Sequence, residues 1–324
     1  MKEEEVRPKA IFDEYLRLCE IDTQTFFLDV KQDKCNCPGC GAVGEFAFEK
    51  SHFSYESCST CHTLFVSPRP VETAFIRYYS EAPSVEYWAT TFFKSTAEAT
   101  KDKLWVPKVK MLLDIHERNG ATGYQVVDIG GGYGIFAEEM ERLTGTRVTV
   151  IEPGPRLADI CRIKGLNVVE KFLQNVTEND LAAGEKAFVS FELFEHLHNP
   201  RAFLESLHGL MQQGEIFTFT TLSSMGVDIQ VLWEHSKSVQ PPHHLNFFNP
   251  ISVRMLLERI GFDVLEISTP GTLDVDIIAN SQELISDRFW RSFITTATES
   301  SRADWQKHLS KTGYSSHMMV SCQK

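Results

Sequence analysis

The sequence predicts an α/β protein in which a doubly wound parallel sheet follows a small metal-binding module. From residue 124 onward, short apolar strands alternate with helices over about a hundred residues, the pattern of a parallel sheet with right-handed crossovers. Before that region, five of the eight cysteines fall between Cys35 and Cys61. Clustered cysteines in a chain without an export signal indicate a metal site rather than disulfides.

Charge and hydropathy indicate which kinds of partner the protein can bind and in which compartment we expect it. The formal net charge is −12, with 42% hydrophobic and 23% charged residues. An acidic chain lacks the basic face that binding to nucleic-acid phosphates needs, so we expect no nucleic-acid partner. The start of the chain is charged and lacks the apolar core of a signal peptide, and no window approaches the ~18 apolar residues of a membrane span. We therefore expect a cytoplasmic protein.

The expected elements follow from periodicity in chain order. Apolar residues at helical spacing predict a leading helix over residues 8–30 and another around residues 101–120. The expected strands are YQVVDIG (124–130), RVTVIEP (147–153), LNVVE (166–170), KAFVSFE (186–192) and EIFTFTT (215–221), with helices between them. DVLEIST (263–269) and SHMMVSCQK (316–324) are expected to close the sheet edge, and residues 281–313 to form a polar helical insertion. Asn199-Pro200 and Asn249-Pro250 each predict an N-cap followed by proline at the first helical position.

The cysteine cluster has the spacing of a four-thiolate zinc site. CPGC at 37–40 and CSTC at 58–61 give C-x2-C-x17-C-x2-C. We expect Cys37, Cys40, Cys58 and Cys61 to close a tetrahedron, with Cys35 as a spare candidate and His62 as a further alternative. Four thiolates leave no open coordination position, so the expected role of the zinc is structural.

A glycine loop follows the first expected strand of the sheet. VVDIGGGYG (126–134) reads D-x-G-x-G-x-G, with Asp128 at the strand end and Gly130, Gly132 and Gly134 in the turn. Glycines permit a sharp turn and let a ligand approach the main chain closely. Glu152 ends the second strand about twenty residues later, where a carboxylate can accept both ribose hydroxyls of an adenosine ligand.

With this loop and Glu152, the sequence resembles the class I S-adenosylmethionine-dependent methyltransferases, whose sheet is Rossmann-like. The resemblance implies that S-adenosylmethionine is the cofactor and that residues 128–134, including Gly131, cradle its methionyl part. It implies that Glu152 binds the ribose, and that Phe191 lies close to the methionyl end. Adenine contacts are expected from the loop around residues 172–175.

Further motifs are similar to those of methyltransferases that carry an N-terminal zinc module and modify sugars, polysaccharides or natural products. These motifs are CPGCG with CSTC, LFVSPRP (64–70), the aromatics Tyr79, Tyr87 and Trp88, and FELFEHLHNP (191–200). The likeness runs from about residue 35 to residue 278. With the periodicity of the flanking segments, we expect an N-terminal helix (1–34), a zinc-binding module (35–70), a helical, aromatic linker and lid (71–123), a cofactor-binding methyltransferase domain (124–280), and a helical insertion with a closing edge strand (281–324). The deoxysugar C-methyltransferases among them carry a further large C-terminal domain, which we do not expect in the residues after 270, and this favours O- or N-methylation.

Histidines are the candidates for a general base, because a hydroxyl acceptor must lose a proton and the unperturbed imidazole pKa of about 6.5 suits that task. His196 follows the fourth strand, whose carboxyl end borders the ligand crevice of such a sheet. PPHHLNFFNP (241–250) offers His243 and His244. In the resembling sugar methyltransferases an acid-His pair stands at this point; His244 matches the histidine, and His243 replaces the acid. His244 is the first choice of base, and His196 assists or replaces it.

The predicted function is therefore O-methylation of a sugar, nucleotide-sugar or glycan hydroxyl. Other readings are N- or C-methylation of a small molecule, methylation of RNA or protein, and a scaffold that binds the cofactor without turnover. The oligomeric state is left open.

Overall fold

The computed structural model of the chain describes residues 2–92, 95–96 and 100–324. Residues 93–94 and 97–99 of the expected linker lie outside the described residues. The chain divides into two compact units, each assembled from several stretches. The first comprises Met1–Ala97, Leu222–Val253 and Ser268–Met318, and the second comprises Glu98–Thr221, Arg254–Ile267 and Met319–Lys324. Each unit is described by itself.

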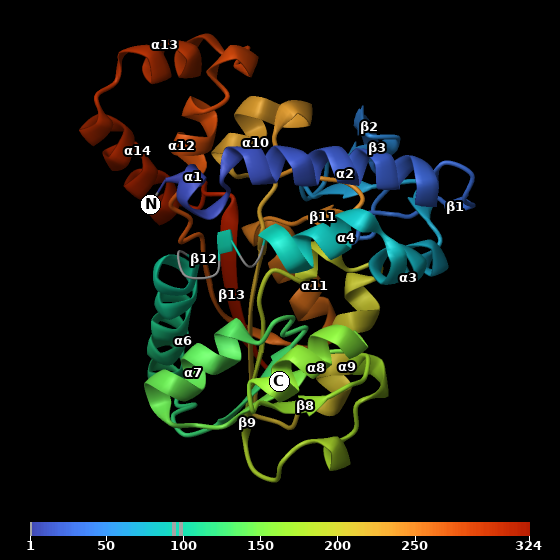
Figure 1. The fold of residues 1–324 in the computed structure, drawn as a ribbon. Coiled ribbons are helices and arrows are strands. Elements are labelled where there is room, and N and C mark those ends of the chain that lie inside the picture. The colour runs from blue at the N-terminus through green and yellow to red at the C-terminus, as the bar shows by residue number, and fades with distance from the viewer. Residues whose placement is uncertain (1, 93–94, 97–99) are drawn as a thin grey trace. The chain divides into compact units, whose positions relative to one another are not determined.

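In the described residues, the second unit is built on a seven-stranded sheet with the order β12-β13-β10-β9-β6-β7-β8. Its strands are β6 (Gln125–Ile129), β7 (Val148–Ile151), β8 (Asn167–Val169), β9 (Lys186–Ser190), β10 (Ile216–Leu222), β12 (Asp263–Ser268) and β13 (His317–Gln323). Figure 1 labels β8, β9, β12 and β13 of this sheet. The pairs β6–β7, β7–β8, β6–β9 and β9–β10 are parallel, as the alternation of strands and helices predicts.

Helices cover both faces of this sheet. The helices are η2 (Lys101–Trp105), α6 (Val106–Arg118), α7 (Ile135–Thr144), α8 (Pro155–Ile163), α9 (Pro200–Leu210) and α11 (Pro250–Ile260), with the short turns η3 (Leu173–Asn175), η4 (Glu178–Asp180) and η5 (Phe194–His196). Leu112 of α6, Met140 of α7 and Cys161 of α8 share one core with strand residues such as Val126. Phe203 of α9 packs instead against Phe217 of β10, with ring centroids 6.5 Å apart. The sheet is thus doubly wound.

The last strand differs from the expectation of a closing edge strand. β13 lies between β10 and β12, so β12 is the edge. Backbone hydrogen bonds join Glu215 to Lys324 at one end of β10 and Ser223 to Ser316 at the other, so β13 runs antiparallel to β10. The physical reason is burial: β13 is buried along most of its length, whereas β12 is half-buried or exposed.

Among the described residues, the first unit contains a four-stranded sheet with the order β11-β4-β3-β2, in which all pairs are antiparallel. These strands are β2 (Glu45–Lys50), β3 (Phe53–Ser57), β4 (Leu64–Val66) and β11 (Asn246–Phe247), and a two-stranded pair joins β1 (Gln32–Asp33) to β5 (Arg69–Pro70). A segment distant in sequence therefore completes the sheet of the cysteine module. Sequence periodicity gives no sign of this pairing.

Helices of the first unit contribute to more than one apolar core. They are α1 (Glu3–Val6), α2 (Lys9–Phe27), α3 (Glu72–Glu81), α4 (Pro83–Tyr87), η1 (Trp88–Phe92), α10 (Val227–Leu232), η6 (Trp233–His235), α12 (Asp274–Ala279), η7 (Gln282–Leu284), α13 (Arg288–Thr296) and α14 (Glu299–Thr312). Phe27 of α2 contacts Phe53 of β3 and Tyr78 of α3, with ring centroids 5.3 and 5.4 Å away. Leu232, Ile278 and Leu309 belong to the separate core of the C-terminal helices. None of the helices in the described ranges has both the length and the apolar character that a membrane crossing requires.

Candidate functional site

The glycine loop joins β6 to α7 in the second unit. Gly130, Gly132 and Gly134 have φ of +70°, +55° and +68°, a region that favours glycine. A Cβ added at Gly134 would lie 2.5 Å from Leu166 Cδ1, so packing alone requires glycine there. A Cβ added at Gly132 would meet no atom within 4 Å. Gly132 therefore faces open space that a ligand can approach.

Glu152 lies directly beside this loop. Its Oε2 accepts a hydrogen bond from the Gly132 amide at 3.0 Å, and its Oε1 accepts one from the Gly154 amide at 2.8 Å. Burial raises the pKa of Glu152 above its ordinary value, and the two amide bonds oppose that shift. Each carboxylate oxygen has a further lone pair, so the side chain can still accept hydroxyl donors. The structure brings together the acidic residue and the loop that the sequence singled out.

Asp128 lies behind the loop, near the end of β6, and is 2% exposed. Its Oδ2 atom has no hydrogen-bond partner among the described residues, and it lies 2.8 Å from the position of a Cβ added at Gly131. Burial, with a smaller contribution from the charge of Glu152, raises the pKa of Asp128 to about 7. Buried polar atoms are nearly always hydrogen-bonded. One oxygen of the Asp128 carboxylate thus has no hydrogen-bond partner among the described residues. A carboxylate in this state beside a glycine loop fits a ligand that carries positive charge, as S-adenosylmethionine does.

Phe191 is buried just after the carboxyl end of β9. The next residue, Glu192, forms an ion pair with Lys108. Glu192 has φ of +53°, and its carboxylate contacts the Lys108 ammonium and the Thr220 hydroxyl, the latter at 3.1 Å. The Lys108 ammonium lies 5.6 Å from the Phe191 ring centroid. Sequence analysis did not identify Lys108 as a site residue. Its position was a usable signal, because a lysine four residues before Leu112 lies on the buried face of the helix, where lysine is rare.

His196 closes the short turn η5 at the same end of β9. Its backbone amide donates to the Leu193 carbonyl at 2.9 Å, and its side chain is half-buried. The preceding Glu195 is 1% exposed. Burial and the neighbouring Glu192 charge raise the pKa of Glu195 to about 8. The segment after β9 thus contains two carboxyl groups, of Glu192 and Glu195, and two imidazoles, of His196 and His198.

His244 lies in the first unit, just before β11. Its Nδ1 atom is 2.6 Å from the Ser238 carbonyl oxygen. A carbonyl only accepts hydrogen bonds, so Nδ1 carries the proton and Nε2 holds the lone pair of the neutral ring. The Tyr55 hydroxyl donates to the His244 carbonyl at 2.8 Å. These contacts fix both the position and the tautomer of this imidazole.

His243 has a different environment from its neighbour. Its Nε2 atom is 2.6 Å from the Tyr78 hydroxyl, which also contacts the Ser84 hydroxyl at 2.8 Å. The Tyr15 and Tyr78 rings lie 5.8 and 5.2 Å from the imidazole centroid. Burial, together with His244, lowers the pKa of His243 to about 3. His243 is therefore neutral at physiological pH and is held in an aromatic enclosure.

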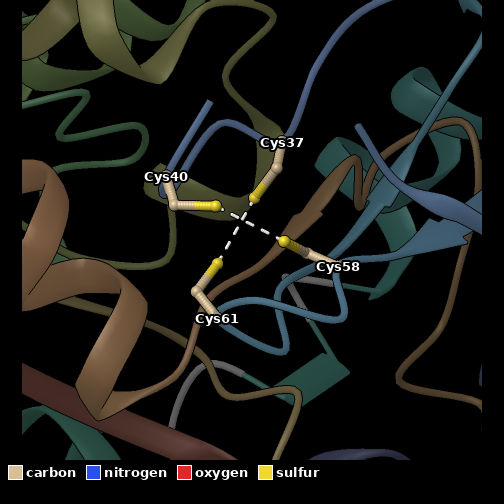
Figure 2. A group of neighbouring side chains, drawn as sticks. All are labelled: Cys37, Cys40, Cys58 and Cys61. Carbon is tan, nitrogen blue, oxygen red and sulfur yellow. Dashed lines mark hydrogen bonds between the residues drawn. The ribbon is translucent and has the colours of Figure 1, made fainter. Parts of the chain in front are cut away.

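The four cysteines of the expected zinc site converge in the first unit (Figure 2). Their sulfur atoms all lie within 4.8 Å of one another, with 3.4 Å between Cys37 and Cys61 and 3.4 Å between Cys40 and Cys58. Zinc–sulfur bonds of about 2.3 Å in a tetrahedron place sulfurs roughly 3.8 Å apart, so the arrangement fits a zinc ion.

Two equivalent turns position these sulfurs. The Cys37 amide bonds to the Ala42 carbonyl at 2.8 Å, and the Cys58 amide bonds to the Thr63 carbonyl at 2.9 Å. The residue after the second cysteine of each turn has positive φ: Gly41 at +82° and His62 at +59°. Cys35, the spare candidate, is not one of the four, and its thiol donates to the Val66 carbonyl at 3.3 Å.

Asn249 connects the end of PPHHLNFFNP to the second turn. Its Oδ1 accepts from the amides of Ile251 and Ser252 at 3.0 Å, the N-cap that Asn-Pro predicted. Its Nδ2 donates to the Cys61 carbonyl at 2.8 Å. The side chain thus begins α11 and also supports the cysteine cluster.

A family model described as "Methyltransferase domain" matches residues 98–267. A ubiquinone biosynthesis O-methyltransferase of Xanthomonas axonopodis pv. citri is 27% identical over 160 residues, which cover 45% of this chain and 66% of the relative. The protein of the same name from Xanthomonas oryzae pv. oryzae is 32% identical over 116 residues, 34% of this chain and 47% of the relative. The chain thus spans about half to two thirds of the curated relatives it matches.

One solved structure that aligns with this chain is the plantazolicin methyltransferase BpumL in complex with SAH. It aligns over 76% of this chain and 93% of its own, with 13% sequence identity and a TM-score of 0.48.

Proposed function

The chain belongs to the methyltransferase domain family, and we propose that it transfers the methyl group of S-adenosylmethionine to a hydroxyl of a sugar, nucleotide sugar or glycan. Family membership confirms the prediction of a methyltransferase. The observation that carries the cofactor assignment is the carboxylate of Glu152 held by the amides of Gly132 and Gly154. A carboxylate with further lone pairs beside an open glycine loop supports the proposed binding of hydroxyl groups.

The residues proposed to hold the cofactor have distinct tasks. Glu152 would accept the ribose hydroxyls, and the loop from Asp128 to Gly134 would cradle the methionyl part, with the incomplete Oδ2 of Asp128 attracting its positive charge. Phe191 would provide an apolar wall near that end. When bound, S-adenosylmethionine supplies an electrophilic methyl group on a sulfonium sulfur. The protein's task is alignment, which can supply several powers of ten in rate.

His244 is proposed as the general base. Because Nδ1 donates to Ser238, Nε2 is the nitrogen that can take a proton from an acceptor hydroxyl. His196 is proposed to assist or replace it. The buried His243, with its lowered pKa, suits a positioning role better than proton transfer. The zinc proposed at the four cysteines would stabilise the module without taking part in the chemistry, since four thiolates complete its coordination.

The names of the curated relatives support an oxygen acceptor, because both are O-methyltransferases. The sugar assignment is supported by the resemblance to zinc-module sugar methyltransferases. A phenolic hydroxyl, suggested by the ubiquinone relatives, is the second candidate. The two candidates differ in acidity: a phenol titrates near pH 10, whereas a sugar hydroxyl is far less acidic. A sugar acceptor therefore depends more strongly on the base.

Calorimetry tests the cofactor site. The wild type should bind SAM and SAH, and Glu152→Gln should weaken binding by roughly tenfold or more, because hydrogen bonds to a charged carboxylate are lost. Glu205→Gln is the matched control, since Glu205 pairs with Arg201 on the surface of α9. Absence of binding by the wild type, or equal binding by Glu152→Gln and Glu205→Gln, contradicts the cofactor assignment.

Turnover tests the base and the acceptor. Nucleotide sugars, glycans and catechols are offered with labelled SAM, and methylation of a sugar is the expected result. His244→Ala should keep SAH affinity and lose about 100-fold in turnover, with the acidic limb of the pH–rate profile abolished. Full turnover by His244→Ala excludes it as the base. SAH binding without methylation of any acceptor would instead support the scaffold reading.

A further inference from the structure

A cavity of about 350 Å³ lies in the first unit beside the second cysteine turn. It is lined by Ser57, His62, Leu64, Ser224, Met225, Gln230, Trp233 and Tyr314, all within that unit. The volume falls at the lower end of the range for small-molecule sites. None of the residues proposed for methyl transfer or for zinc lines it.

Two of its lining residues have strained backbones. Among the residues that the structure describes, five other than glycine have positive φ, and two of these, His62 at +59° and Trp233 at +48°, line this cavity. The equivalent position of the first cysteine turn is Gly41, which also has a positive φ, +82°, and no side chain. The first cysteine turn thus has glycine at this position, whereas the second turn, which borders the cavity, has histidine. Strain of this kind is concentrated at ligand sites.

The lining combines aromatic surface with neutral polar groups. Trp233 is half-buried and packs on Phe48, with ring centroids 5.2 Å apart, while Tyr314 is 54% exposed. Ser57, Ser224 and Gln230 contribute hydroxyl and amide groups. Ser224 is fixed, because its hydroxyl donates to the His62 carbonyl at 2.7 Å and its carbonyl accepts from the Gln230 amide at 2.6 Å.

This composition selects a class of ligand. Among the described residues that line the cavity, none is Asp, Glu, Lys or Arg, so neither a phosphate nor an ammonium group finds an opposite charge. A purely apolar ligand would cover the polar side chains of Ser57 and Gln230 without pairing with them. A hydroxylated ring presents an apolar face to Trp233 and Tyr314, and its hydroxyls can pair with the polar side chains.

We propose that this cavity is a binding site for a neutral sugar ring, with Trp233 and Tyr314 as the apolar surface and His62 as a hydrogen-bonding side chain. The site is separate from the proposed methyl transfer and does not require turnover. It would hold a sugar unit of a longer molecule or a free saccharide.

Saturation-transfer NMR titration of the full chain tests the site, with methyl hexopyranosides and neutral trisaccharides as probes and no cofactor present. At least one saccharide should bind saturably. His62→Gly should weaken that binding about tenfold, through loss of a side-chain hydrogen bond, and should keep the turn, because Gly41 occupies the equivalent position. Tyr314→Ala should weaken binding to a similar extent.

The matched control is His52→Gly, since His52 also has positive φ, +64°, but lies in the turn between β2 and β3 and does not line the cavity. It should bind saccharide within about twofold of the wild type. Metal content and the far-UV spectrum show whether each variant is folded. The proposal is overturned if no saccharide binds, if His62→Gly and His52→Gly bind equally, or if indole binds more tightly than every saccharide. Saccharide binding without methylation leaves this site in place while the proposed function fails.

Discussion

Replacing Gly132 by alanine should separate cofactor binding from folding. Gly132 has φ of +55°, and an added Cβ would meet no protein atom within 4 Å. The substitution should therefore lower the unfolding free energy by about 1 kcal/mol, which is the cost of holding alanine in a left-handed conformation. The loop backbone and its bond to Glu152 can remain in place.

The same Cβ would project into the space proposed for the cofactor. Overpacking at a closely fitted contact costs about 1–3 kcal/mol, which corresponds to roughly a tenfold to hundredfold loss of SAH affinity. Isothermal titration with SAH measures this loss. Urea unfolding followed by circular dichroism measures the stability of the same samples.

Two other glycines that flank α7 are matched controls. Gly145 has φ of +71° and no atom within 4 Å of an added Cβ, so Gly145→Ala should lose about 1 kcal/mol of stability and no affinity. Gly134→Ala adds a clash with Leu166 at 2.5 Å and Cys161 at 2.9 Å, and should lose about 2–4 kcal/mol. The reasoning is refuted if Gly132→Ala binds SAH as tightly as Gly145→Ala, or if it loses as much stability as Gly134→Ala.

Three further predictions concern the metal, a helix cap and pH. Metal analysis should return one zinc per chain, lost in Cys37→Ser and kept in Cys35→Ser; equal zinc in the two variants would contradict the four-cysteine assignment. Asn249→Ala should lower the unfolding free energy by about 2–3 kcal/mol, because it removes an N-cap and a buried bond to the cysteine turn, whereas Asn199→Ala, which removes only an N-cap, should cost about 1 kcal/mol; urea unfolding compares them. Because the folded-state pKa of Asp128 is raised to about 7, the folded protein retains a proton that the unfolded chain releases above its ordinary pKa near 4, so the contribution of Asp128 to stability decreases as pH rises between these values. The unfolding free energy of the wild type relative to Asp128→Asn, measured without cofactor, should fall by about 3 kcal/mol between pH 5 and pH 8, and a flat difference would show that the pKa is not raised.

Local patterns in the sequence predicted the central sheet well. The parallel strands from residue 124 to residue 222, their helices and the glycine loop all depend on periodicity and turn chemistry within short windows. The contact between Glu152 and the loop was also predictable, because adjacent parallel strands end at the same edge of a sheet. β13 was misplaced because apolar character indicates burial but does not say which strands lie on either side.

The segment PPHHLNFFNP (241–250) has features that local sequence patterns predict and others that they do not. Proline, asparagine and aromatic residues predicted a stiff segment and a helix start, and the Asn249 cap agrees with this. Nothing local indicated that Asn246 and Phe247 would pair with β4 of the cysteine module, more than 170 residues earlier. The different environments of His243 and His244 depend on that pairing and on Tyr78 from α3.

The sequence by itself determined a cysteine spacing that fits zinc, a glycine loop with its acidic partner, and the order of strands and helices that carries them. Each of these is set by residues close in sequence or by the repeating geometry of parallel strands. Only the tertiary structure decided that β13 lies inside the sheet, that Lys108 meets Glu192, and that His243 is buried while His244 keeps a defined tautomer. These outcomes depend on packing between distant segments, because burial and hydrogen-bond partners are properties of the assembled core.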